Sequence, residues 1–118
     1  MDSPLLLPLG LFAVAATAGL TMAARLFAQK APPVILPVLH GLFAVSGVVT
    51  LFLAIQAGGL SQYALYALAL FLAAALGGLF LISFQLRGKF PPRAIILVHA
   101  LVAVSAFALL FASAFQII

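Results

Sequence analysis

The chain has 118 residues, of which 68% are hydrophobic and only 5% are charged: five Lys or Arg and one acid, Asp2. Soluble domains carry about 25% charged residues, so this composition excludes a soluble globular protein, and five cations are too few to form a nucleic-acid-binding surface. There is no Cys, which excludes disulfides, thiolate metal sites and a Cys nucleophile, and a single acid excludes paired-carboxylate catalysis. We therefore expect an integral membrane protein that is not a stand-alone enzyme.

Four apolar stretches are each long enough to cross a bilayer, which takes about 20 apolar residues. They predict helices at 5–28, 33–56, 62–87 and 93–116 within a single membrane domain, 1–118. Each of the three connections contains Gly or Pro, which end helices. Because the apolar runs are this long and lack polar alternation, transmembrane strands are excluded. The first stretch lacks a basic start and exceeds the apolar region of about 7–15 residues typical of signal peptides, so we expect a retained span.

The basic residues all lie at the first or third connection, while the second connection and both ends of the chain have none: Arg25, Lys30, Arg87, Lys89 and Arg93. In a four-span chain these two connections share one side of the membrane. The positive-inside rule assigns loops 29–32 and 87–92 to the cytoplasm and both termini to the outside. The charges then serve as topology signals and as contacts to lipid head groups.

The two halves of the chain align without a gap at an offset of 59 residues. A Lys-x-Pro-Pro pattern at 30–33 recurs at 89–92, and the chain's two His residues, His40 and His99, each follow the second Pro by seven positions. This predicts an all-α bundle of four helices built from two tandem hairpin repeats, 4–59 and 63–118. Because each repeat spans twice, the repeats share one orientation and a pseudo-two-fold axis along the membrane normal. The second and fourth helices are expected to lie diagonally or to face each other across this axis.

The two histidines are expected about 10 Å inside their helices, at the same depth. Ionisable residues within a span are costly and are candidates for function. Small residues on the same helical faces leave room for a flat ligand or for close helix packing: Ala44, Gly47, Ala103 and Ala106. A further packing seam of small residues is expected on the first and third helices: Ala15, Gly19, Ala23 and Gly78.

Two imidazoles at one depth allow several roles. They can ligate one haem iron from both sides, with the propionates near Arg25, Arg87, Lys89 and Arg93. They can bind another metal, although two His without Cys or carboxylate make a poor zinc site. They can carry protons, although no Asp or Glu within a span continues such a relay. They can also contact a quinone or lipid, or hydrogen-bond to hydroxyls such as those of Ser46, Thr50, Ser83 and Ser105.

Paired transmembrane His at matched depth, with small residues nearby, resemble the four-helix b-type cytochromes of bacterial membranes, the cytochrome b561-like group. The resemblance implies haem b held by His40 and His99, electron exchange with quinones, and a bacterial inner membrane. The chain departs from that group in offering two ligands where its members usually have four, and in lacking the further polar residues of a quinone site. It is also similar to small uncharacterised bacterial four-helix proteins with a duplicated Pro-Pro…His hairpin.

The leading hypothesis is a small b-type haem protein or electron-transfer subunit with His40 and His99 as ligands. One alternative is an accessory subunit that stabilises a larger membrane complex. Another is a small transporter or lipid-modulating protein, for which few polar groups are present within the spans. Under each of these hypotheses the chain lies in a lipid bilayer, and a homo-oligomer or a place in a larger complex is expected.

Overall fold

The computed structural model describes residues 3–118; the acid noted above, Asp2, lies outside them. A 3-10 turn, Ser3–Leu5, leads into four helices, α1 (Leu6–Phe27), α2 (Ile35–Gln56), α3 (Gln62–Leu86) and α4 (Arg93–Ala114). All four helices are long and apolar enough to cross a membrane. The prediction of an all-helical chain with four such helices is confirmed, and every predicted helix boundary lies within two residues of the observed one.

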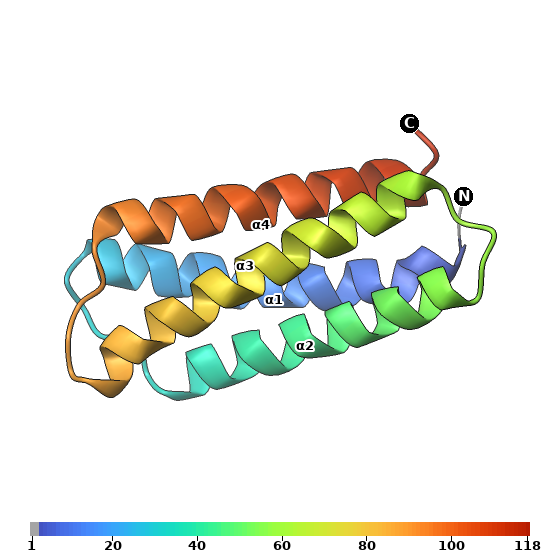
Figure 1. Ribbon diagram of the computed structural model, residues 1–118. Helices are drawn as coiled ribbons and strands as arrows, with labels where there is room; N and C mark the ends of the chain where they lie inside the picture. Colours follow the sequence, from blue (N-terminus) through green and yellow to red (C-terminus); the bar gives the residue numbers. More distant parts are fainter. Residues whose placement is uncertain (1–2) are drawn as a thin grey trace.

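The four helices form an elongated antiparallel bundle of 45 × 22 × 19 Å (Figure 1). The closest packing is within the two hairpins, α1 on α2 and α3 on α4, whereas α2–α3 and α1–α4 touch less extensively. The helices α2 and α4 therefore lie on one diagonal of the bundle, and α1 and α3 lie on the other. This is one of the two arrangements expected for the helices that carry the histidines.

The helices α1 and α3 end in the same backbone motif. The second residue after each helix adopts a left-handed conformation, Gln29 with φ 57° and Gly88 with φ 69°. The following Lys then donates its backbone N–H to a carbonyl five residues earlier, Lys30 to Arg25 and Lys89 to Phe84, both at 2.8 Å. This Schellman arrangement satisfies carbonyls at the helix end, and the Pro-Pro pair that follows cannot continue the helix. Both hairpins therefore turn in the same way.

The buried apolar core lies in one half of the bundle, toward the end where the chain begins and ends. Its centre is the stack of Phe12 of α1 on Phe71 of α3, whose ring centroids are 3.6 Å apart and whose planes differ by 2°. The other buried members of this cluster surround the stack: Leu5, Leu9, Leu51, Ala64, Ala67, Leu68, Ala106, Leu110 and Ala114. In the opposite half most inward-facing side chains are only half-buried. The bundle is thus tightly packed in one half and looser in the other.

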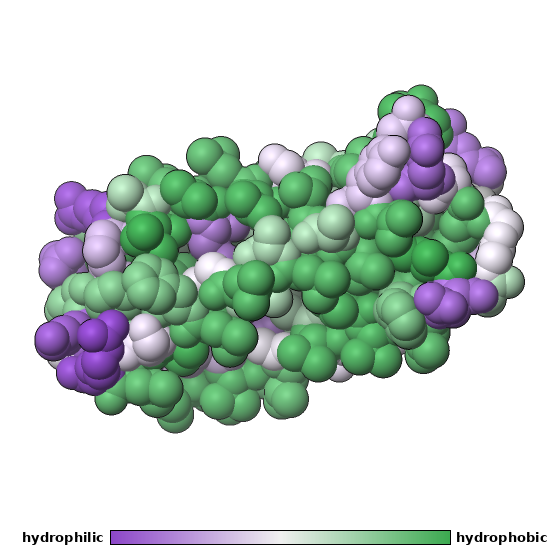
Figure 2. Space-filling view, viewed as in Figure 1, coloured by the Kyte–Doolittle hydropathy of each residue, from purple (hydrophilic) through white to green (hydrophobic). Residues whose placement is uncertain are grey.

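The five basic residues lie together at the looser end of the bundle, which we call the basic end (Arg25, Lys30, Arg87, Lys89 and Arg93). Two side chains tie the hairpins together there. Arg93 Nη2 donates to Phe27 O at 3.1 Å, and Gln85 Nε2 donates to Pro32 O at 3.2 Å. The face shown in Figure 2 is apolar along its middle and hydrophilic at both ends, the pattern expected of a chain that crosses a bilayer.

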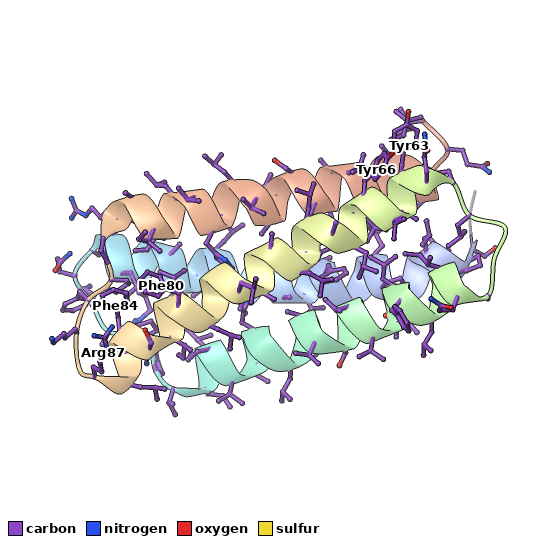
Figure 3. All side chains as sticks on the ribbon, in the orientation of Figure 1. Tyr63, Tyr66, Phe80, Phe84 and Arg87 are labelled. Atoms are coloured by element: carbon purple, nitrogen blue, oxygen red, sulfur yellow. The ribbon has the colours of Figure 1, made fainter. Side chains whose placement is uncertain are left out.

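The opposite end of the bundle is held by hydroxyl groups. Ser61 caps α3 by accepting the backbone N–H of Tyr63, and its Oγ lies 3.4 Å from the Oγ of Ser113 near the end of α4. Beside this cap the rings of Tyr63 and Tyr66 meet edge to face, with centroids 5.9 Å apart (Figure 3). Tyrosines at a helix end suit the boundary between hydrocarbon and water.

Candidate functional site

The two histidines face each other within one chain. His40 of α2 and His99 of α4 come from diagonally opposed helices, and their ring centroids are 6.3 Å apart with an interplanar angle of 73°. Both side chains are half-buried. They lie between the Phe12–Phe71 stack and the basic end, where the tightly packed half of the bundle gives way to the looser half. The two His residues of the sequence are therefore brought together.

His40 is fixed by the neighbouring helix of its own hairpin. Its Nδ1 lies 2.7 Å from the backbone carbonyl of Ala15. In the neutral tautomer with its proton on Nδ1, the imidazole donates to this carbonyl and leaves the Nε2 lone pair free. The ring sits against Gly19, where an added Cβ would lie 2.9 Å from His40 Cε1. Only a glycine at this position lets the imidazole reach the carbonyl.

His99 occupies a similar place on α3 but is held less tightly. Its ring lies over Gly77 and Gly78, whose added Cβ atoms would be 3.4 Å and 3.3 Å from the nearest ring atoms. The Ala74 carbonyl is its neighbouring backbone acceptor, but the geometry falls short of a hydrogen bond, so Nδ1 has no partner among residues 3–118. The pair is thus unequal, because His40 has a hydrogen bond to a backbone carbonyl and the buried Nδ1 of His99 has none among the described residues.

The small residues expected beside the histidines have different surroundings. Gly47 faces the ring of Phe12, because an added Cβ would lie 2.8 Å from two of its atoms. Ala106 is fully buried in the core cluster around the same stack, while Ala44 and Ala103 are half-buried. The room that Gly47 provides is therefore filled by an aromatic ring of the core.

The basic residues expected near a ligand are largely engaged at their own end of the bundle. Arg87 stacks over Phe84 at 4.7 Å and donates from Nε to Ser83 O at 3.0 Å. Arg93 stacks over Phe27 at 5.4 Å, and Arg25 Nη2 donates to Ala31 O at 2.9 Å. Lys89 is exposed. Within residues 3–118, the structure shows no hydrogen bond between these side chains and the imidazoles.

Three features of the site were missed by sequence reasoning. The carbonyl of Ala15 carries no residue-type signal, since every residue has one. Gly77 was not singled out, although its neighbour Gly78 and the matching Gly19 were expected to pack helices. The Phe12–Phe71 stack was not expected from the sequence, because the chain has 11 Phe residues. The one signal for this pair was that Phe12 and Phe71 align at the offset of 59 residues.

We expect Gly19→Ala to destabilise the bundle and displace His40. The new methyl would collide with the imidazole at 2.9 Å, so the ring would lose its bond to Ala15. Overpacking and a lost hydrogen bond together cost about 2–4 kcal/mol of the free energy of unfolding. Reversible denaturation in mixed detergent micelles measures this loss. Gly41→Ala is the matched control, because open space surrounds its added Cβ; equal stability of the two variants would contradict the described contact.

Comparison of the chain with protein-family models, with curated proteins and with solved structures finds no match in any of the three.

Proposed function

We propose that the chain is a small electron-transfer protein of the membrane in which His40 and His99 hold the iron of a haem b from its two sides. One observation carries this proposal: two imidazoles from diagonal helices face each other, with ring centroids 6.3 Å apart. Metal–imidazole bonds of about 2 Å on each side, added to the two ring radii, span about 6 Å. The spacing of the rings therefore suits one metal ion between them.

The donor set also favours haem over a bare metal ion. Among residues 3–118 no group of three or more His, Cys, Asp or Glu side chains could hold a metal. Two protein ligands suit an ion that brings its other ligands with it, as the iron of a porphyrin does. The bond from His40 to Ala15 O supports this assignment, because ligating histidines usually donate their second ring N–H to a carbonyl or carboxylate.

The surroundings favour one side of the imidazoles for such a group. The Phe12–Phe71 stack closes the core on one side of the imidazoles, whereas the half toward the basic end is more loosely packed. Arg25, Arg87, Lys89 and Arg93 stand at that end as partners for propionates. When bound, haem iron would supply one-electron transfer; His40 and His99 would hold the iron, and the chain would provide an apolar setting. A quinone is the proposed redox partner.

The topology that goes with this function is a further part of the proposal. We place the basic end in the cytoplasm and both termini outside, in a bacterial inner membrane, on the positive-inside rule. We also propose that the hairpins are tandem repeats related by a pseudo-two-fold axis. Support comes from the matching ends of α1 and α3 and from three pairs that share the offset of 59 residues: His40 and His99, Phe12 and Phe71, Gly19 and Gly78.

A second candidate function is that of an accessory subunit, in a homo-oligomer or a larger membrane complex. The observation that favours it is that His40 already has a structural task, since it fills the space over Gly19 and bonds to Ala15 O. In this case the imidazole pair stabilises contacts between helices, and the exposed apolar faces contact lipid or partner subunits.

Visible absorption of the purified protein separates the two functions. For the haem protein we expect a Soret band that shifts on reduction with dithionite, with sharp α and β bands from six-coordinate iron. The protein must be expressed with haem supplied, so that a lack of cofactor is not mistaken for a lack of binding. A featureless spectrum under these conditions would overturn the haem proposal and leave the accessory subunit, to be pursued by purification of the intact complex.

A further inference from the structure

A furrow runs along the outer side of the first hairpin. It lies where Thr17, Ala18 and Thr21 of α1 face Leu36, Leu39 and Phe43 of α2, and it holds about 380 Å3. A second hollow of about 200 Å3 continues it past Phe43 to Leu11. From Leu11 to Thr21 the helix rises about 15 Å, half of the hydrocarbon thickness of roughly 30 Å. This α1–α2 furrow therefore extends over about half of the hydrocarbon thickness, along the middle of α1.

The lining of the furrow suits a hydrocarbon chain. Its hydroxyl groups are already used within their own helix, because Thr17 Oγ1 donates to Ala13 O at 3.0 Å and Thr21 Oγ1 donates to Thr17 O at 2.9 Å. The remaining lining side chains are apolar. A ligand in the furrow would gain little from polar groups of its own, since no hydroxyl proton is left to bond it.

A cation with spare donors stands at the end of the furrow. Arg25 follows Thr21 by four residues and so lies on the same face of α1, about 6 Å further along. Its guanidinium has five N–H donors. The Nε group is buried and Nη2 gives one bond to Ala31 O, so the donors left for a ligand are the remaining N–H groups of Nη1 and Nη2. No Asp or Glu occurs in that range. A phosphate group matches the unused donors in charge and geometry.

The second hairpin carries different residues at the corresponding positions. Counting 59 residues onward, Leu76, Phe80 and Phe84 stand where the first hairpin has Thr17, Thr21 and Arg25. The rings of Phe80 and Phe84 contact each other edge to face at 5.3 Å, and Arg87 lies over Phe84 (Figure 3). The second hairpin thus has larger apolar side chains in place of the two threonines, and an aromatic ring in place of the arginine.

We propose that the α1–α2 furrow binds one anionic phospholipid from the leaflet at the basic end, with an acyl chain along the furrow and the phosphate on Arg25. The apolar furrow suits the acyl chain in length, and Arg25 on the same face of α1 suits the phosphate in charge. The proposal requires that the chain spans a bilayer. It assigns Arg25 to the lipid phosphate, so that Arg87, Lys89 and Arg93 remain as partners for the propionates of the proposed haem.

Native mass spectrometry of the full chain tests this proposal. The protein, freed of lipid in detergent, is mixed with equal amounts of phosphatidylglycerol and phosphatidylcholine of identical acyl chains. One basic residue near a membrane surface favours an anionic lipid by about fivefold, so we expect one phosphatidylglycerol retained with roughly that preference. Arg25→Gln should bring the preference close to one, while the matched Arg87→Gln should keep it, because Arg87 follows α3, which does not line the furrow.

A second variant fills the furrow with residue types that the second hairpin has at the corresponding positions. Thr17→Leu combined with Thr21→Phe copies residues 76 and 80 of the second hairpin and should abolish retention of both lipids, with helicity checked by circular dichroism. Equal retention of the two lipids by the unmodified chain would overturn the proposal. So would an equal effect of Arg25→Gln and Arg87→Gln, displacement of the phospholipid by a polyprenyl quinone, or a dimer that excludes lipid.

Discussion

The double variant His40→Ala, His99→Ala is expected to lose haem completely while the chain still inserts as a helical bundle. These are the only His residues, and the chain has no Cys, so no other imidazole or thiolate can replace the lost axial ligands. Insertion depends on the apolar spans, which the substitutions leave apolar. Haem content by pyridine haemochrome, together with membrane extraction and circular dichroism, measures both parts of this result.

Single variants and a control sharpen this test of the ligands. His40→Ala leaves one imidazole and should give a high-spin spectrum in place of the six-coordinate one, and His99→Ala should do the same. Ser46→Ala is a control on the same helix, because this hydroxyl bonds only its own helix at Leu42 O, and it should leave the spectrum unchanged. Haem retained by the double variant would exclude both histidines as the ligands.

Phe12→Ala and Phe71→Ala are each expected to destabilise the bundle by about 3–5 kcal/mol of the free energy of unfolding. The two rings stack at 3.6 Å and are 4% and 7% exposed, so truncation of either leaves a cavity in the only tightly packed half of the described bundle. The double variant should lose less than the sum of the two single losses, because one ring's removal already breaks the stack. Reversible unfolding in mixed micelles gives these values.

Phe80→Ala provides the comparison for the buried rings. This ring is 51% exposed and should cost less than about 1 kcal/mol, as substitutions away from a core usually do. If Phe80→Ala and Phe12→Ala cost the same, burial at the Phe12–Phe71 stack would not be the source of the stability.

The positions of the four long apolar helices followed directly from the sequence. The four helices, their bounds to within two residues and the gathering of the five cations at one end are all local properties. They depend on runs of apolar residues, on Pro-Pro pairs that stop a helix and on short connections that make neighbouring helices antiparallel. The matched positions of His40 and His99 along their helices were also anticipated, because both follow a helix start by the same number of residues; the sequence left open whether they pair within one chain or between two chains.

Only the tertiary structure decided which residues surround the imidazoles. In soluble proteins an apolar stripe shows which helix face points inward, but these helices are apolar on all sides, because lipid is as apolar as the core. The sequence therefore could not show that Gly47 meets Phe12 and not an imidazole, that the carbonyl of Ala15 receives His40, or that His99 is left without an equal bond. Composition and spacing determined the helices and the matched positions of the histidines along them. The rotation of each helix about its axis, and with it the contents of the site, came from packing between the helices.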